Sequence, residues 1–400
     1  MVYVVEMPDM PSCGLPRRDL ARPPRSVLQV MESKLPVGQI PGLPNLGNTC
    51  FMNAVLQCLL NTPGRLLQLL SAFRSPQGPA ARGLVAQRLA ELAAAYGGPG
   101  GGRHCLEEEG RVLEGLKLAL VDREEGYASC QQQDAYEFLG HLLEGLDEEL
   151  VTLLAHFGHA SPGDGIVRKF CGITTRTKRL CHGCRTVFSA DRVTDTALRL
   201  PLISPAAQMD AGLRSREERE LVALEELIEA VQEPEEIRGY DCDTCAAALT
   251  AFRHEADAKR VKTVHARSTI TQRAGLIAGT SDILIVALYR FLNVLDGDGE
   301  FTTVKIRRRV AIPTVMSLET GLYRLYGVVS HMGESLSSGH YVAAVRSLRD
   351  HHWYDCDDSQ VRPIGDRCLS GVSEITETRP NADPFILFYH RVGGEIEHDD

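Results

Sequence analysis

The 400-residue sequence lacks any hydrophobic run of the roughly 18–20 residues that a membrane-spanning helix needs. Its apolar start is broken by Glu6 before a signal-peptide core develops. These absences favour an intracellular protein, cytoplasmic or nuclear, without a membrane partner. Cysteine is too scarce for a disulfide scaffold, at 12 residues. In a reducing compartment we expect these cysteines to be thiols, metal ligands or nucleophiles.

An excess of positive charge is also missing. The 43 Lys and Arg residues face 53 Asp and Glu residues, which gives a formal charge of −10. Basic and acidic residues are nearly balanced between positions 165 and 260, so the sequence carries no nucleic-acid footprint. With 44% hydrophobic and 24% charged residues, the chain has the composition of a folded globular protein. We expect it to be monomeric.

The sequence divides into a helical part and a later β-rich part. Residues 1–40 belong to a proline-rich stretch without apolar periodicity, and this predicts an extended N-terminal segment. Apolar residues at helical spacing predict helices at Phe51–Leu60, Leu84–Tyr96, Leu106–Val121 and 132–146, and later at Leu224–Val231. Ser129 and Gln132 form a candidate capping box for the fourth helix. Strands are predicted at Gly172–Leu180, Arg185–Val193, Ile283–Leu292, Thr303–Val310, Leu322–His331, Tyr341–Arg346 and Phe385–His390. This order indicates an α+β fold.

Cys50 is the first candidate for a chemical role. It follows the turn and cap residues 45–49 and stands at the start of the Phe51–Leu60 helix. Free backbone N–H groups and the positive end of the helix dipole stabilise a thiolate there. Cys58 lies within the apolar stripe and fits a core role instead. Asn45 is placed to direct its amide at a developing oxyanion.

A thiol nucleophile needs a base and a group that orients the base. His340 follows Ser338 and Gly339 and opens an apolar strand, where small neighbours leave room for a substrate backbone. His331, at the end of the preceding strand, is the alternative base. An acid of the segment 353–358 is placed to accept the second ring N–H of the histidine.

Two CxxC pairs form a second group of residues with a chemical pattern. Cys181 and Cys184 make the first pair, and Cys242 and Cys245 make the second. Four thiolates complete the tetrahedral shell of a structural zinc ion, so the pattern predicts one Zn²⁺ per chain and no organic cofactor. The long intervening segment leaves open that the two pairs belong to separate elements.

Two charged groups allow more than one interpretation. Asp134 and Glu137 lie three residues apart on one helix face, which fits either a solvated helix start or the recognition of a basic peptide. The run 305–309 fits either a nuclear signal or, preferably, an edge strand protected by charges.

Three of these segments together resemble the ubiquitin-specific protease family, a group of papain-like cysteine peptidases. The segment Gly42–Gln57 resembles the family's Cys box, Gln132–Leu139 its second signature block, and Ser338–Val342 with Trp353–Ser359 its His box. The two CxxC pairs resemble its zinc-bearing fingers. The similarity covers the chain from about Leu43 to Tyr389. The family's Gly-Gly-His reads Ser338-Gly339-His340 here, and Asp357 stands where many members have Asn.

The resemblance implies a helical thumb at about 41–160, fingers at about 165–200 and 236–270, and a palm formed by the remainder of a catalytic domain spanning 41–400. Cys50 would be the nucleophile and His340 the general base and acid, with Asp357 as the orienting residue. Asn45, assisted by Asp358, would stabilise the oxyanion. The residues expected to bind substrate are Asp134, Glu137 and Tyr341.

The resemblance implies hydrolysis of the peptide or isopeptide bond at the C-terminal glycine of ubiquitin through a thioester acyl-enzyme. The expected partners are therefore ubiquitin or ubiquitylated proteins. Two alternatives stay open: the same chemistry on a ubiquitin-like modifier, and a catalytically silent scaffold that binds ubiquitin.

Overall fold

The structure is a computed structural model that describes residues 40–63, 85–96, 105–156, 165–189, 192–254, 267–295, 300–336, 338–348, 350–364, 379 and 381–392. The extended segment predicted for the N-terminus lies outside the described residues, apart from its last residue, Ile40. No helix within these ranges combines the length and the apolar character that crossing a membrane requires.

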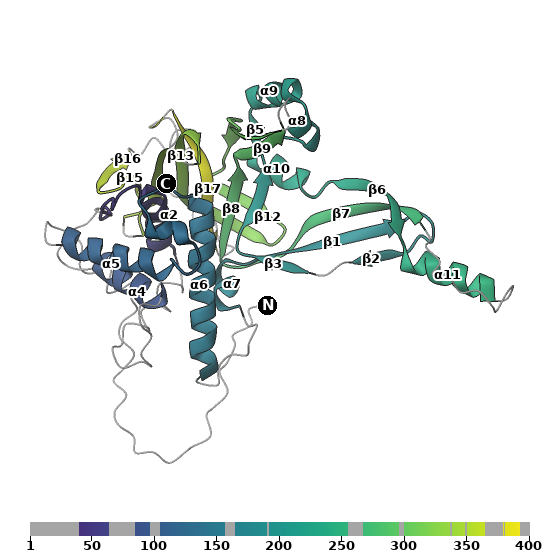
Figure 1. Ribbon diagram of the computed structural model, residues 1–400, viewed down its shortest axis with the longest axis horizontal. Coiled ribbons are helices and arrows are strands. Elements are labelled where there is room, and N and C mark those ends of the chain that lie inside the picture. The colour runs from purple at the N-terminus through teal and green to yellow at the C-terminus, as the bar shows by residue number, and fades with distance from the viewer. Residues whose placement is uncertain are drawn as a thin grey trace, which may run out of the picture.

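Helices of the N-terminal part gather on one side of the molecule (Figure 1). The buried helix α2 packs against α6, and α6 also contacts α4 and α7. The bounds are α2 (Cys50–Leu60), α4 (Val85–Tyr96), α5 (Cys105–Ala119), the 3₁₀ helix η2 (Glu125–Ala128), α6 (Ala135–His156) and α7 (Ile166–Cys171).

An eight-stranded sheet lies next to these helices. Its strand order is β16-β15-β14-β13-β17-β8-β4, and β12 pairs with β13. All pairings are antiparallel except that of β4 with β8. The bounds are β4 (Leu198–Pro201), β8 (Ile283–Tyr289), β12 (Val315–Leu318), β13 (Gly321–Ser335), β14 (Ser338–Arg346), β15 (Trp353–Asp357), β16 (Gln360–Ile364) and β17 (Ala382–Val392).

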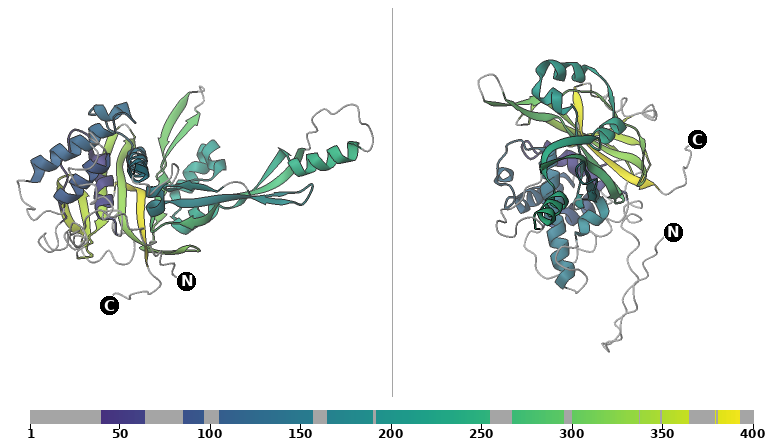
Figure 2. Two further views of the ribbon diagram at one scale, coloured as in Figure 1. Left: turned by 90° about the horizontal axis from the view of Figure 1, so that it is seen from below. Right: turned by 90° about the vertical axis from the view of Figure 1, so that its right-hand side faces the viewer.

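A five-stranded sheet projects away from this body and ends at helix α11 (Figure 2). Its order is β2-β1-β7-β6, and β3 pairs with β1. The bounds are β1 (Ile173–Cys181), β2 (Val187–Ser189), β3 (Val193–Asp195), β6 (Pro234–Asp241), β7 (Arg267–Thr280) and α11 (Asp243–His254). Two smaller pairings and three helices complete the description: β9 (Phe291–Leu295) with β10 (Phe301–Lys305), β5 (Val222–Ala223) with β11 (Val310–Ala311), α8 (Pro205–Met209), α9 (Ala211–Arg219) and α10 (Leu224–Ala230).

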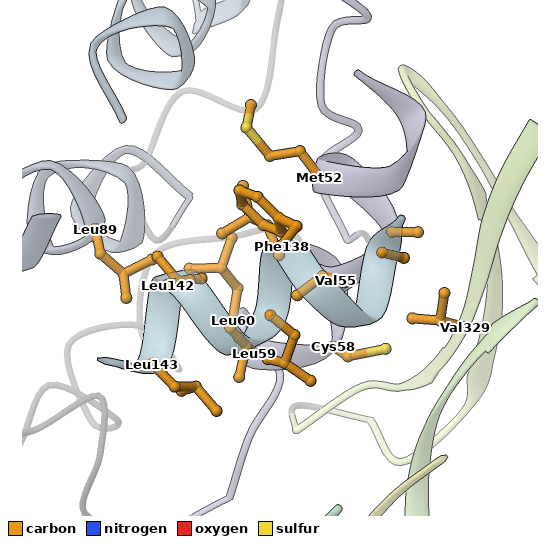
Figure 3. Packing of buried hydrophobic residues seen from close by; sticks show 14 of the residues in the cluster. Met52, Val55, Cys58, Leu59, Leu60, Leu89, Phe138, Leu142, Leu143 and Val329 are labelled. Carbon is orange, nitrogen blue, oxygen red and sulfur yellow. The ribbon is translucent and has the colours of Figure 1, made fainter. Parts of the chain in front are cut away.

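The largest hydrophobic core lies between the helices and one face of the eight-stranded sheet. Figure 3 shows Phe138 and Leu142 of α6 packed with Val55 and Leu59 of α2. A second core includes other residues of the same sheet, such as Leu284. A small third core surrounds the cysteines of the five-stranded sheet. Burial of α2 between α6 and the sheet fixes the position of its first residue, Cys50, against the strands.

Two local predictions differ from the structure. The fourth helix begins at Ala135 and is capped by Asp134, whose Oδ1 accepts hydrogen bonds from the backbone N–H groups of Tyr136 and Glu137 at 2.5 and 3.2 Å. Ser129 instead bonds within the preceding turn, so the predicted capping box is wrong. A carboxylate one residue before the helix is the better cap because it reaches two free N–H groups at once.

The basic run 305–309 does not form the expected charged edge strand. Only Lys305 belongs to a strand, at the end of β10. Lys305 is buried in an ion pair with Asp383, while Arg307 pairs with Glu334 and Arg308 with Glu217. These three cations therefore take part in ion pairs within the chain, of which that of Lys305 is buried.

Candidate active site and cysteine cluster

A tight turn brings Cys50 to the first position of α2. Gly47 and Asn48 have positive φ angles of 96° and 56°, which only glycine and a few polar residues adopt readily. The side chain of Asn45 holds the turn, because its Oδ1 accepts the backbone N–H groups of Gly47 and Thr49 at 3.0 and 3.1 Å. The Cys50 side chain lies at the helix N-terminus with only 3% of its residue surface exposed.

His340 connects this thiol to an acid on the sheet. It lies in β14, and its Nε2 is 2.6 Å from Oδ1 of Asp357 at the end of β15. A hydrogen bond to Cys50, together with that to Asp357, raises the pKa of His340 to about 9 against the opposing effect of burial. Since Nε2 is occupied, the ring presents Nδ1 to the thiol. The three side chains thus form a continuous Cys–His–Asp arrangement.

Arg379 holds the same acid from the other side. Its Nη2 donates to Oδ2 of Asp357 at 2.9 Å, and its Nε and Nη2 both bond Asp355 at 2.9 to 3.1 Å. Burial would raise the pKa of Asp357, but the hydrogen bonds from His340 and Arg379 lower it below its ordinary value. Asp357 is therefore an ionised acceptor with both oxygens occupied.

Asp358 joins the strand end to the loop before α2. Its Oδ2 accepts from Nδ2 of Asn45 and its Oδ1 from Nδ2 of Asn53, both at 2.8 Å. Its backbone carbonyl accepts the N–H of Leu43 at 2.9 Å. Three contacts from one residue therefore set the spacing between the thiol-bearing helix and the sheet that carries His340.

The Asn45 amide has one N–H left for a substrate. Its Nδ2 carries two hydrogens, and Asp358 accepts one of them. Asn53, by contrast, also donates towards the carbonyls of Leu43 and Pro44 at 3.3 and 3.1 Å. Of the two asparagines, Asn45 thus has an amide hydrogen for which the described residues provide no acceptor.

The alternative base, His331, has no place in this arrangement. It is fully buried, and Lys305 donates to its Nδ1 at 3.1 Å. Burial and the Lys305 charge lower the pKa of His331 to about 4, so the ring is neutral at physiological pH. It packs beneath Gly339, where a Cβ would lie 2.8 Å from His331 Nε2 and 2.1 Å from a backbone oxygen. The glycine before His340 is therefore required for this packing.

The proposed substrate-binding residues differ in exposure. Glu137 is exposed and Asp134 is partly buried, and burial raises the pKa of Asp134 to about 6. Tyr341 is only 1% exposed, and burial and the Asp134 charge raise its pKa. A substrate contact with Tyr341 in this arrangement would involve its backbone, whereas Glu137 is open to solvent and Asp134 is open only in part.

The four CxxC cysteines lie together, although they come from distant segments. Their sulfur atoms all lie within 4.8 Å of one another. Sγ of Cys181 is 3.6 Å from that of Cys245, and Sγ of Cys184 is 3.7 Å from that of Cys242. Four sulfurs at about 2.3 Å from a tetrahedral zinc would be separated by about 3.8 Å, so this cluster can hold a zinc ion. The two pairs therefore form one cluster, although Cys181 ends β1 and Cys245 lies in α11.

Neighbouring groups favour the thiolate at Cys181 and Cys184, whereas burial raises the pKa of Cys245. Ser268 Oγ lies 3.1 Å from the Cys181 sulfur, and this contact lowers the pKa of Cys181 to about 6. Hydrogen bonds from Thr186 lower the pKa of Cys184. A Cβ on Gly183 would lie 3.1 Å from the Cys245 sulfur, so the turn packs directly on the cluster.

Comparison with known proteins places the chain in a family. The family model described as ubiquitin carboxyl-terminal hydrolase matches residues 41–389. The chain belongs to the ubiquitin carboxyl-terminal hydrolase family. Its relatives are of the ubiquitin-specific protease type, as the sequence motifs predict.

Curated relatives of this chain include human proteins of one named group. The chain is 25% identical to human ubiquitin carboxyl-terminal hydrolase 17-like protein 5 over 90% of its own length and 57% of that protein. It is also 25% identical to the human 17-like protein 6, again over 90% of its length and over 76% of that relative. The chain thus spans little more than half the length of the first of these relatives.

Solved structures confirm the α+β ubiquitin-specific protease fold. The SAGA Ubp8/Sgf11/Sus1/Sgf73 DUB module bound to ubiquitin aldehyde matches with a TM-score of 0.65 at 19% identity, covering 88% of this chain and 70% of that chain. The same module bound to monoubiquitin gives a TM-score of 0.61, also at 19% identity, over 88% and 69% of the two chains.

Two residues of the site escaped the sequence analysis. Asn53 lies within the Cys box as a polar residue on a buried helix, and this was a usable signal for a role in binding Asp358. Arg379 had no such signal, because it follows Asp357 by 22 residues in a stretch without a motif.

Proposed function

We propose that this hydrolase is a deubiquitinating cysteine protease that cleaves the peptide or isopeptide bond after the C-terminal glycine of ubiquitin. The observation that supports this most strongly is the contact of Cys50 with His340 and of His340 with Asp357, in a chain of this family. The neighbour solved with ubiquitin aldehyde supports the choice of substrate.

Catalysis begins with proton transfer from the Cys50 thiol to His340. Asp357, held ionised, favours the imidazolium that results. The thiolate attacks the carbonyl carbon of the terminal glycine. His340 then protonates the leaving lysine amine, which leaves a thioester on Cys50. With His340 now neutral, the ring takes a proton from water, which attacks the thioester and releases the ubiquitin carboxylate.

The tetrahedral intermediate carries a negative oxygen that needs donors. The backbone N–H of Cys50 stands free at the start of α2, and Asn45 supplies its second amide hydrogen. Asp358 fixes the orientation of this amide before the substrate arrives. This assigns Asn45 to the oxyanion and Asp358 to its support.

Asp134 and Glu137 are proposed to bind the basic C-terminal tail of ubiquitin. A partly buried carboxylate interacts more strongly with an incoming arginine than a fully solvated one does. The raised pKa of Asp134 still leaves it mostly ionised at physiological pH. The exposed Glu137 adds charge at the same helix start.

The cysteine cluster is proposed to hold one structural Zn²⁺. The four sulfur atoms offer a closed set of ligands with no position for a substrate, so the metal would stabilise the end of the five-stranded sheet. None of the catalytic steps above passes through this ion.

Turnover of a panel of fluorogenic substrates tests the function. Ubiquitin and several ubiquitin-like modifiers are each coupled through the C-terminus to a fluorophore, and kcat/KM is measured for each. We expect ubiquitin to give the highest value, and Cys50→Ala to abolish turnover. Preference for another modifier would replace the substrate. Binding of ubiquitin without any turnover would favour the silent scaffold.

A further inference from the structure

Arg379 is the one group in the described active site that binds the orienting acid and lies outside the motifs. Its guanidinium contacts Asp357 and Asp355, and 21% of its side-chain surface is exposed. The two acids are similarly enclosed, at 28% and 16%. Charge-assisted hydrogen bonds that are half-buried and shared between two carboxylates hold geometry better than a surface ion pair does.

The geometry of β15 explains why one arginine reaches both acids. Residues two apart on a strand point to the same face, and Asp355 and Asp357 have this spacing. Asp355 takes both Nε and Nη2 of the guanidinium, which fixes the plane of Arg379. Nη2 then reaches Oδ2 of Asp357, leaving Oδ1 directed at His340.

From these contacts we infer that Arg379 is a positioning residue for catalysis, which keeps the Asp357 carboxylate rotated towards His340 and is itself oriented by Asp355. The inference rests on the proposed function only for its substrate. Without Arg379, one oxygen of Asp357 loses its donor, and the carboxylate is free to rotate away from the imidazole. We expect this misplacement of the Asp357 carboxylate to lower turnover about 10- to 100-fold.

If Arg379 acted only through its charge, its loss would have the opposite effect on the Cys50 thiolate. If Asp357 stayed in place after the loss of Arg379, the carboxylate would be less neutralised and would favour the His340 imidazolium more. The thiolate–imidazolium pair would then be at least as populated as before. If Asp357 instead rotates away, the imidazolium loses its partner and the pair becomes less populated. The population of the Cys50 thiolate therefore distinguishes positioning from charge.

The test measures this thiolate without using ubiquitin. The 400-residue chain is treated with iodoacetamide at neutral pH, and alkylation of Cys50 is followed by mass spectrometry in wild type, Arg379→Met and Arg379→Lys. Positioning predicts slower alkylation for Arg379→Met, by about fivefold or more, with Arg379→Lys intermediate because it keeps the charge but loses the planar fork. Unchanged or faster alkylation overturns the inference.

Asp355→Asn and Arg362→Met complete the set. Asp355→Asn removes the group that orients Arg379, so alkylation should again slow while the charge of Arg379 remains. Arg362, an exposed neighbour of Asp355 on β16, bonds Gln360 and serves as the matched arginine control, with an unchanged rate expected. If Arg379→Met does not fold, the alkylation rates of Arg379→Lys and Asp355→Asn test the inference instead. Wild-type alkylation rates in both variants would contradict a positioning role for Arg379.

Turnover of ubiquitin substrate is measured in parallel. Positioning predicts that kcat falls in Arg379→Met while KM changes by less than about threefold. Normal alkylation of wild-type Cys50 with no ubiquitin turnover would reject the proposed substrate but leave the alkylation test of Arg379 intact. The two failures are therefore distinguishable.

Discussion

Three acids of the segment 355–358 have different roles because each binds different partners. Asp355 binds Arg379, Asp357 binds His340, and Asp358 binds Asn45 and Asn53. Sequence alone assigned the orienting role to this acidic segment, and its resemblance to a family pointed to Asp357. Only the contacts show why Asp355 and Asp358 are not free to replace it: each is already committed to another side chain.

The raised pKa of His340 predicts the alkaline limit of activity. The imidazolium is the general acid for the leaving amine, so kcat/KM should fall as pH rises through about 9. Asp357→Ala removes a carboxylate that favours the imidazolium. Its alkaline limit should therefore move to lower pH by about one unit, with kcat reduced more than affinity. The measurement is a pH profile of kcat/KM for both proteins, and an unmoved limit in Asp357→Ala would contradict the orienting role.

The ionised Asp134 carboxylate is predicted to lower the stability of the folded protein and to favour substrate binding. Its folded-state pKa of about 6 lies above the ordinary carboxyl value, so the folded state holds its proton more tightly and loses stability as pH rises from about 4 through 6. Asn still caps α6 without the cost of burying charge. Asp134→Asn should therefore raise the free energy of unfolding at pH 7.5 by about 1 kcal/mol, after discounting for solvent, while KM for ubiquitin substrate rises.

Denaturant titration at two pH values checks this prediction. The gain in Asp134→Asn should disappear near pH 4, where the wild-type carboxyl is neutral in the folded protein. Glu137→Gln is the matched control, because Glu137 is exposed and its charge should affect binding but not stability. A variant less stable than wild type at pH 7.5 would show that the charge itself is needed for the cap.

At the scale of elements, a buried lysine joins three strands next to His340. Lys305, in β10, pairs with Asp383 in β17 at 2.8 Å and donates to the backbone carbonyls of His331 and Gly333 in β13. Burial lowers the pKa of Lys305, and the bonds to Asp383 oppose this effect. Loss of one partner leaves an uncompensated charge inside the protein.

Lys305→Met should therefore lower the free energy of unfolding by about 3 kcal/mol, because two carbonyls and His331 Nδ1 lose their donor and Asp383 keeps only the longer ion pair with Arg307, at 3.5 Å. The double variant Lys305→Met/Asp383→Asn should recover part of this loss, since it removes a carboxylate that has lost the nearer of its two cations. Urea unfolding measures both, with the exposed Lys178→Met as control. Equal stability of Lys305→Met and Lys178→Met would mean that the buried pair contributes nothing.

The elements that sequence patterns predicted are those that pack an apolar face against a hydrophobic core. Helices α2 and α6 and strands β8, β13, β14 and β17 were all expected, because their apolar residues repeat with the period of the element. Strands β6 and β7 were missed. They pair in the five-stranded sheet, where β6 has no fully buried residue and its side chains do not alternate between core and solvent. A strand without an apolar face carries no period-two signal.

The candidate site was predictable where its parts lie within short motifs. Cys50, His340, Asn45 and the four zinc-ligand candidates each had a local pattern. The bonds of Asn45 to Asp358 and of Arg379 to Asp357 join residues that no pattern relates, the first pair 313 positions apart. Such contacts depend on how the helices dock on the sheet, which apolar periodicity does not specify.

At the scale of the whole molecule, the cysteine cluster lies in a core of its own, separate from the two larger cores, of which the first contains Cys50. We expect about one zinc per chain. Removal of zinc by a chelator should then loosen the outer part of the five-stranded sheet first. Hydrogen exchange should show lost protection near the ends of β1 and β6 while the alkylation rate of Cys50 stays near that of the untreated protein.

Cys184→Ser should reproduce the loss of zinc, whereas Cys130→Ser, at an exposed cysteine outside the cluster, should keep the metal. Metal analysis of both variants gives the comparison. A purified wild-type protein that is folded and free of metal would show that these four thiols do not form a zinc site.

The central claim is that Cys50 attacks the C-terminal carbonyl of ubiquitin. The most direct measurement is reaction of the 400-residue chain with ubiquitin that carries an electrophile in place of its last peptide bond, followed by mapping of the modified residue by mass spectrometry. We predict one adduct per chain, at Cys50, which disappears in Cys50→Ala and slows in His340→Ala. An adduct that persists in Cys50→Ala, or a folded wild-type protein that forms none, would contradict the claim.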